Sequence, residues 1–138
     1  MPIYIYKDEV DVLNNDDYNL YNMHQKTKPF DAYKLNLVKL NDNDSFFLLG
    51  HKFRVLHTPG HTLGSACYIM DDKIMFSGDT LFQVGIGRID FPTGNANKMI
   101  ESLQKIKKLD KGLKIYPGHG VSTTLDFELK YNEYLINA

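Results

Sequence analysis

The chain has 138 residues, of which 43% are hydrophobic and 24% charged. These values are typical of a globular protein, and the length is that of one domain, so we expect residues 1–138 to form one domain. With 16 basic and 17 acidic residues, the formal net charge is -1. This balance excludes the basic surface that would hold nucleic acid or an anionic membrane.

No stretch approaches the ~18 apolar residues that a membrane span needs. Residues 1–8 also lack the basic region and apolar run of a signal peptide. The single cysteine, Cys67, cannot form an internal disulfide, and we expect it to be a small buried residue within a strand. A chain of this kind is expected in the reducing cytoplasm.

The first 57 residues predict mainly strands. Residues 2–6 alternate β-branched and aromatic side chains, as a short strand does, and Val10 and Leu13 then follow at helical spacing in residues 7–13. Residues 14–28 predict a loop with a short irregular helix, closed by Pro29. Strands are predicted over 35–40, 46–49 and 53–57, with a polar turn after the first and a tight reversal at 50–52.

The second half predicts a hairpin, two helices and one more strand. The hairpin pairs residues 65–70 with 73–77. Residues 97–109 place apolar side chains at three- and four-residue steps, which predicts an amphipathic helix with its lysines on the solvated face and a stop at Gly112. A strand at 113–116 follows, and a last helix starts near Thr123 and Thr124, which are good capping residues. These elements indicate a mixed α/β or α+β layered fold.

Three predicted strand ends carry side chains that suit a metal site. His61 follows a Pro-Gly turn, Asp79 follows Gly78 and His119 lies between two glycines. Zinc takes imidazole and carboxylate ligands, and a catalytic zinc keeps an open position for water, whose pKa it lowers to about 7. Asp79 has two oxygens and is therefore suited to bridge two ions. The pattern predicts a metal-dependent hydrolase with its ligands on loops at one edge of the sheets.

Each of the three residues alone has a simpler interpretation. His61 would serve as a turn residue, Asp79 as the aspartate of an Asx-turn and His119 as a surface histidine. Their joint occurrence, each at a strand end and beside glycine, favours the metal site.

The other three histidines are expected to be ordinary surface or turn residues. Pro59-Gly60 precludes the helix that would bring His57 and His61 onto one face. His24 and His51 have no partner at metal-ligand spacing.

Four motifs carry a resemblance to a known family: T-P-G-H-T-L-G-S, S-G-D-T-L-F, G-I-G-R-I-D-F-P and Y-P-G-H-G-V-S-T-T. In order and spacing they resemble the later motifs of metallo-β-lactamase-fold hydrolases, most closely the short bacterial glyoxalase II-like branch. The resemblance implies an αββα sandwich, two zinc ions at its edge, and hydrolysis of a small-molecule thioester by metal-bound hydroxide. Carried over by position, His61 would bind the first ion, His119 the second, and Asp79 both.

Arg88 and Asp90 lie in the G-R-x-D loop of the same family. We expect them to form an ion pair that braces this loop around the metal site, without binding substrate directly.

The chain departs from the family at its amino-terminal signature, H-x-H-x-D-H, which supplies two ligands to each ion. Its histidines stand only at 24, 51, 57, 61 and 119, and no two are spaced as H-x-H. The chain therefore resembles a truncated member with an incomplete sandwich. Catalytic zinc has three protein ligands, so we expect the chain alone to bind metal weakly or not at all and to be a poor hydrolase.

An incomplete sandwich would expose an apolar face and an unpaired strand edge, and such surfaces are normally covered. We therefore expect a homodimer, or pairing with a separately made amino-terminal fragment. The alternative to an enzyme is a non-catalytic oligomeric domain that retains the motifs as vestiges.

Overall fold

The computed structural model describes residues 1–20 and 31–138. The strands are β1 (Ile3–Tyr6), β2 (Leu37–Leu40), β3 (Ser45–Leu48), β4 (His51–His57), β5 (Ala66–Met70), β6 (Ile74–Gly78), β7 (Leu81–Phe82), β8 (Gly85–Ile86), β9 (Lys114–Pro117) and β10 (Thr123–Thr124). The helices are α1 (Glu9–Asn14), the 3-10 helix η2 (Ala32–Lys34), α2 (Ala96–Lys107), α3 (Leu125–Tyr131) and α4 (Glu133–Asn137). Within the described part of the chain, no helix is long and apolar enough to cross a membrane. His24 and residues 21–28 of the predicted loop lie outside that part.

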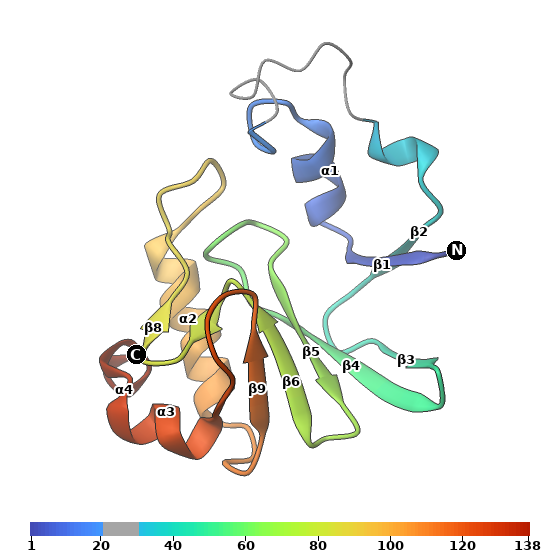
Figure 1. Ribbon diagram of the computed structural model, residues 1–138. Coiled ribbons are helices and arrows are strands. Elements are labelled where there is room, and N and C mark those ends of the chain that lie inside the picture. The colour runs from blue at the N-terminus through green and yellow to red at the C-terminus, as the bar shows by residue number, and fades with distance from the viewer. Residues whose placement is uncertain (21–30) are drawn as a thin grey trace.

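One six-stranded sheet, in the order β10-β9-β6-β5-β4-β3, forms the centre of the molecule. Its pairs are antiparallel except β6 and β9, which run parallel. Strands β1 and β2 form a separate parallel pair, with Ile3 opposite Leu37. Figure 1 shows α2, α3 and α4 gathered at the β6 and β9 side of the sheet, while β1, β2 and α1 lie together on the other side of the molecule.

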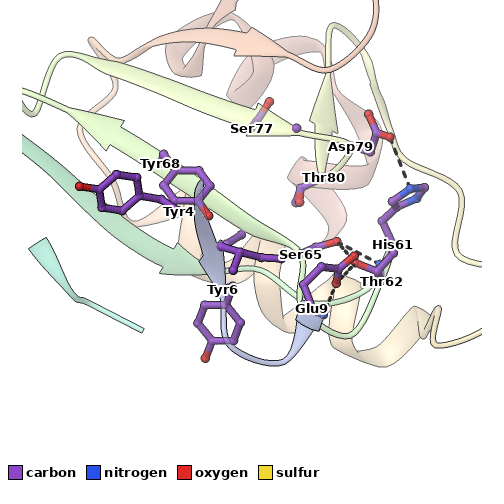
Figure 2. A pocket seen from close by; sticks show the side chains of 14 residues that line it. Tyr4, Tyr6, Glu9, His61, Thr62, Ser65, Tyr68, Ser77, Asp79 and Thr80 are labelled. Atoms are coloured by element: carbon purple, nitrogen blue, oxygen red, sulfur yellow. Dashed lines mark hydrogen bonds and ion pairs between the residues drawn. The ribbon is translucent and has the colours of Figure 1, made fainter. Parts of the chain in front are cut away.

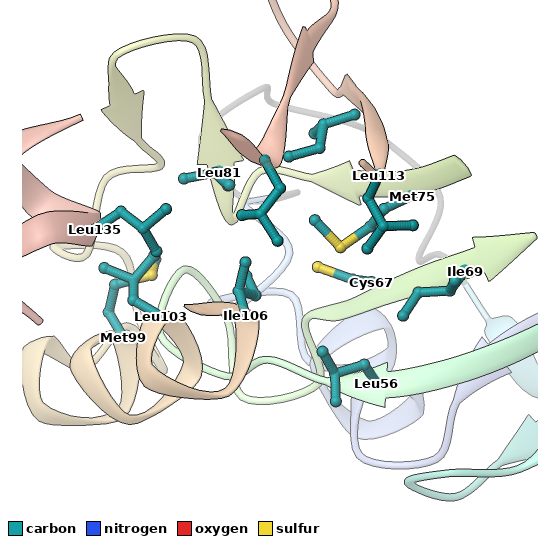
Figure 3. Close-up of a cluster of buried hydrophobic side chains, with 12 residues drawn as sticks. Leu56, Cys67, Ile69, Met75, Leu81, Met99, Leu103, Ile106, Leu113 and Leu135 are labelled. Atoms are coloured by element: carbon teal, nitrogen blue, oxygen red, sulfur yellow. The ribbon is translucent and has the colours of Figure 1, made fainter. Parts of the chain in front are cut away.

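The main hydrophobic core lies between the six-stranded sheet and α2, α3 and α4 (Figure 3). Alternate strand residues point to this side, as the two-residue period of a strand requires. A fully buried Leu or Ile contributes about 1.5–3 kcal/mol, so this cluster accounts for much of the stability. Its members are Leu56, Cys67, Ile69, Met75, Leu81, Met99, Leu103, Ile106, Leu113, Ile115, Leu125 and Leu135.

The opposite face of the sheet is aromatic and only partly covered. Strands β1 and β2 pack on its β3–β5 end, where Tyr6, Leu40 and Val55 are buried together. The neighbouring side chains of β6 and β9, Phe76 and Tyr116, lie beyond this cover and remain 39% and 37% exposed. Among residues 1–20 and 31–138, the second strand layer therefore does not extend over the β6–β9 end.

The predicted fold class, an incomplete αββα sandwich of mixed α/β type, is confirmed. The predicted strands and the 97–109 helix are also present, with bounds shifted by at most two residues. Cys67 is fully buried within β5, and burial raises the pKa of its thiol to about 11. This agrees with the predicted packing role, since a thiolate is disfavoured there.

The turn between β3 and β4 differs from the predicted reversal at 50–52. It consists of Leu49 and Gly50, both with positive φ (51° and 81°), and β4 already begins at His51. Two central residues of positive φ are the signature of a two-residue type I′ hairpin, whose twist matches that of the strands.

The last predicted helix is two helices. Thr124 does cap α3, since its side chain accepts a hydrogen bond from the Phe127 amide, but Thr123 pairs with β9 before the helix starts. Asn132 adopts an extended backbone between α3 and α4, and its side chain accepts from the amides of Tyr134 and Leu135. An asparagine that caps the next helix in this way ends the previous one.

The lysines of α2 were predicted to form a solvated face, but two of them bind main-chain oxygens of other segments. Lys105 donates to the main-chain oxygen of His57 at 2.9 Å, and Lys107 donates to the main-chain oxygens of Ile136 and Ala138 at 2.9 and 3.0 Å. Long basic side chains can reach such carbonyls while their stems lie along apolar surface.

Candidate metal centre

The sheet topology brings the three predicted ligands to one edge. Strands β6 and β9 are parallel neighbours, with Gly78 opposite Pro117, so their carboxyl ends place Asp79 and His119 side by side. Strand β5 is antiparallel to β6, so the β4–β5 loop that carries His61 reaches the same edge.

Asp79 lies between the two histidines. Its Oδ2 is 3.4 Å from His61 Nε2, and its Oδ1 is 3.5 Å from His119 Nε2 (Figure 2 shows the His61 contact). The side chain of His61 is 15% exposed, whereas that of His119 is 77% exposed. Each carboxylate oxygen therefore faces one imidazole nitrogen, which is the arrangement expected of a bridging carboxylate.

The orientation of His61 suits a metal ligand. Its Nδ1 lies 2.8 Å from the main-chain oxygen of Arg88, and a carbonyl oxygen can only accept, so Nδ1 carries the proton. In the neutral ring, Nε2 is then left with a lone pair that faces the lone pairs of Asp79. Two such groups attract one another only through a cation placed between them, either a proton or a metal ion.

The separations also suit zinc, but the ligand set is incomplete. Ligands at about 2.0–2.1 Å from a tetrahedral ion lie roughly 3.3–3.4 Å apart, which is close to the separations of 3.4 and 3.5 Å found here. Each ion would nevertheless receive one histidine and one carboxylate oxygen from this chain. Within residues 1–20 and 31–138, no three His, Cys, Asp or Glu side chains converge on one position where a metal ion could sit. The residues present fit half of a binuclear centre.

Helix α2 fixes the main chain that leads to His61. Lys105 binds the carbonyl of His57, Ser102 Oγ donates to Pro59 O at 2.7 Å, and the Asn95 amide donates to Gly60 O at 2.9 Å. Gly60 has φ +147°, and a Cβ there would lie 2.6 Å from Met99 Cα. Only glycine allows this close approach, which explains the Pro-Gly turn of the motif.

Glu9 is a residue of this site that sequence reasoning missed. It belongs to α1, and its Oε2 accepts from Thr62 Oγ1 at 2.8 Å and from the Gly64 amide at 3.0 Å (Figure 2). A Cβ on Gly64 would collide with the Glu9 main chain. The turn after His61 is therefore held from the β1–α1 segment, and no local signal in the sequence announces a contact across more than fifty residues.

The main chain of two further loops approaches Asp79 closely, one at its carboxylate and the other at its main-chain oxygen. A Cβ on Gly118 would meet Asp79 Oδ1, and a Cβ on Gly87 would meet Asp79 O. Gly78 has open space around it but adopts φ +51°, which favours glycine for its backbone freedom. The glycines that flank the ligands thus allow three loops to converge.

Arg88 and Asp90 form the predicted ion pair. It is bidentate, with Nε to Oδ1 at 2.6 Å and a terminal nitrogen to Oδ2 at 2.7 Å. The Arg88 guanidinium also lies 4.2 Å from the ring centroid of Phe91. The contact between the Arg88 carbonyl and His61 could not be predicted from the sequence, because it involves the main chain of Arg88 and not its side chain.

We expect Arg88→Ala to change the titration of Asp90. The hydrogen bonds from the guanidinium hold the pKa of Asp90 at about 2, and without them it should return to the ordinary value of about 3.9. A carboxyl whose pKa is lowered in the folded state stabilises that state above its ordinary pKa, and the contribution is lost as the pH falls towards 2. Carboxyl-carbon NMR titration measures the change, with Lys98→Ala as the control. An Asp90 pKa that stays near 2 in Arg88→Ala would contradict the expectation.

A hollow of about 350 Å³ opens beside the three residues, lined by His61, Asp79, Phe82, Gly87, Arg88, Phe91 and His119. The Phe91 ring meets His61 edge-on with centroids 5.3 Å apart, and the Phe82 ring meets His119 in the same way at 5.9 Å. The walls next to the imidazoles are therefore aromatic.

Two other histidines lie away from the site, in agreement with the sequence. His57 stacks on Tyr6 and has its Nε2 2.9 Å from Leu63 O, and His51 pairs with Asp71 at 2.6 Å.

Comparison with known proteins agrees with these features. The family model described as the metallo-beta-lactamase superfamily matches residues 1–119. The chain is 43% identical over 88 residues to hydroxyacylglutathione hydrolase GloC of Haemophilus influenzae, covering 62% of this chain and 42% of that protein. It is 31% identical over 112 residues to PksB of Bacillus subtilis, named "Probable polyketide biosynthesis zinc-dependent hydrolase", covering 78% of this chain and 49% of that protein.

Solved structures show the same fold. The BLEG-1 B3 metallo-beta-lactamase matches with a TM-score of 0.82 at 32% identity, over 98% of this chain and 65% of that one. TTHA1623, in a di-iron-bound form, matches with a TM-score of 0.78 at 28% identity, over 97% of this chain and 65% of that one. The chain spans less than half the length of GloC and PksB and about two thirds of the two structures. The resemblance stated from the motifs is confirmed, and the chain belongs to the metallo-beta-lactamase superfamily of metal-dependent, hydrolase-like proteins.

Proposed function

We propose that this chain is the carboxy-terminal part of a zinc-dependent hydrolase of the glyoxalase II-like type, which cleaves small-molecule thioesters and has little or no activity by itself. The observation that carries the proposal is the position of Asp79, with one carboxylate oxygen facing His61 and the other facing His119. The thioester class is supported by the likeness to GloC, which is named as a hydroxyacylglutathione hydrolase.

In this proposal His61, Asp79 and His119 would hold two metal ions, and Asp79 would offer one carboxylate oxygen to each. Zinc supplies a Lewis acid that polarises a carbonyl and lowers the pKa of its water to about 7. The Arg88 carbonyl keeps the proton of His61 on Nδ1, so that Nε2 is free to bind. The Phe91 ring lies against the largely buried imidazole of His61, whereas the imidazole of His119 contacts Phe82 and remains open to solvent.

The missing ligands are proposed to come from a complementary amino-terminal segment that carries the H-x-H-x-D-H signature. A hollow of about 400 Å³ lies between β1 and the edge of the sheet, and His61 and Asp79 form part of its wall. The exposed rings of Phe76 and Tyr116 continue from it across the sheet. A segment bound in this hollow would cover the apolar face. It would also reach both incomplete metal positions, the one beside His61 and the one beside His119. The single cysteine of this chain, Cys67, is buried and free, and a cytoplasmic location is proposed.

Calorimetric titration with zinc and sedimentation at micromolar concentration test the proposal. The isolated chain should bind zinc weakly and hydrolyse a hydroxyacylglutathione thioester poorly. After addition of a recombinant segment bearing H-x-H-x-D-H, two zinc ions per complex and thioester hydrolysis are expected.

The other outcomes assign different functions. If a dimer of the isolated chain bound zinc tightly, a second copy of the chain would supply the missing ligands. The proposed amino-terminal segment would then be wrong. If the chain formed an oligomer that bound no zinc with or without the segment, the proposal of a zinc-dependent hydrolase would be wrong. The non-catalytic oligomeric domain would then be favoured.

A further inference from the structure

Helix α3 carries a carboxylate that is completely buried, Glu128. Its Oε1 accepts from Thr123 Oγ1 at 2.6 Å, and its Oε2 accepts from the Val84 amide at 2.9 Å and from Asn132 Nδ2 at 2.8 Å. Among the described residues no cation pairs with it. A carboxylate is rarely buried without a counter-charge, so its position calls for a reason beyond filling the core.

Two of the three donors, Thr123 and Val84, belong to the two segments that form one side of the candidate metal centre. Thr123 lies four residues after His119, at the end of the loop that carries this histidine. Val84 lies in the turn of the β7–β8 hairpin, with φ +57°, two residues after Phe82. Asn132 also donates to the Gly85 carbonyl of this hairpin at 3.0 Å. One buried side chain thus joins the His119 loop to the hairpin.

The hairpin in turn touches both histidines. Its Phe82 ring stands edge-on to His119, with centroids 5.9 Å apart and an interplanar angle of 77°. The chain that leaves the hairpin through Gly87 places the Arg88 carbonyl 2.8 Å from His61 Nδ1. A shift of the hairpin would therefore be transmitted to His119 through Phe82 and to His61 through the Arg88 carbonyl.

We propose that Glu128 is a positioning residue of the metal centre, which sets Phe82 against His119 and the Arg88 carbonyl against His61. It acts through main-chain and hydroxyl donors and touches neither histidine. Only the effect on metal affinity rests on the proposed function; the positioning itself is a property of the chain without metal.

Three substitutions separate positioning from simple packing. In Glu128→Gln the side-chain oxygen can still accept from Val84 and Asn132, and its NH₂ can donate to the Thr123 hydroxyl, which rotates to accept. Glu128→Met keeps the length and removes every acceptor, so the donors are left unpaired. Thr123→Val has the same shape as threonine and removes only the contact to the His119 loop.

Carbon–proton NMR spectra of the full chain with labelled histidines report the ring positions directly. In Glu128→Met, the signals of His119 and His61 should shift while those of His51 and His57 stay in place. Thr123→Val should shift His119 alone, and Glu128→Gln should restore the wild-type positions. Ile69→Val, a buried change in β5, is the control for general loosening of the core.

The proposal is overturned if Thr123→Val leaves His119 unmoved, or if Ile69→Val moves His119 and His61 as much as Glu128→Met does. Should Glu128→Met fail to fold, Thr123→Val and Glu128→Gln still decide the question. In the completed protein, zinc affinity should fall 10–100-fold in Glu128→Met, as for other residues that orient ligands, and unchanged affinity would contradict the proposal. Absence of zinc binding by the wild type would count against the proposed function alone, because the histidine shifts are measured without metal.

Discussion

Replacing Asp79 with Asn should abolish the binding of both metal ions in the completed protein. The asparagine keeps the shape of the side chain but has a single oxygen, and its NH₂ would face one of the two imidazoles as a donor. The metal position that faces the NH₂ thereby loses its oxygen ligand. The other metal position keeps an oxygen ligand, but one without negative charge. We expect zinc affinity to fall by more than the roughly 100-fold seen on removal of residues that only orient a ligand. Elemental analysis after dialysis and calorimetric titration measure the loss.

His57→Gln is the matched control for this substitution. His57 lies at the end of β4, four residues before His61, but it faces Tyr6 and the Leu63 carbonyl. Its replacement should leave the zinc content unchanged. Equal zinc binding by Asp79→Asn and the wild type would show that Asp79 is an ordinary turn aspartate.

Gly87→Ala should be the most destabilising single-methyl change near the site. A Cβ at position 87 would collide with the Asp79 carbonyl oxygen and lie 3.3 Å from His61 Nδ1. The obstacle is main chain, so relief requires the whole hairpin to move. Overpacking of this kind commonly costs 1–3 kcal/mol, and we expect the free energy of unfolding to fall by about 3 kcal/mol in urea denaturation, with altered NMR signals of His61.

Gly85→Ala provides the comparison within the same hairpin. A Cβ there would lie 3.9 Å from Gln83 O and 4.0 Å from Phe82 Cβ, which is ordinary contact distance. We expect its effect on the free energy of unfolding to stay within about 0.5 kcal/mol. If the two variants were equally stable, the close packing of residue 87 against Asp79 would be wrong.

The sequence could predict the edge of the sheet where the three residues meet, because the information is local. Each of His61, Asp79 and His119 follows an apolar strand and stands beside glycine, and strand ends with glycine favour exposed loops. The parallel pairing of β6 and β9 was not predicted as such, yet it is what places Asp79 beside His119.

What could not be predicted depends on contacts between distant segments. Glu9 lies 53 residues from Thr62 and has no local motif. Glu128 has the pattern of an ordinary helical acid, and nothing in the spacing of α3 shows that it points inward. The break at Asn132 was missed because asparagine within a helical pattern is only mildly unfavourable, whereas its capping of α4 and its bond to Glu128 arise in the folded chain.

The separate β1–β2 pair has a consequence for how a partner segment could enter. Two strands of four residues each form a unit that is marginal by itself, so this layer should open locally at a far lower free energy than the six-stranded sheet. Opening would uncover the hollow beside Asp79 and part Glu9 from the turn at Thr62. Hydrogen exchange would then be fastest in the strands that close over the site. The strands beside the hollow would thus open first, and the sheet next to Asp79 and His119 need not unfold for a segment to enter.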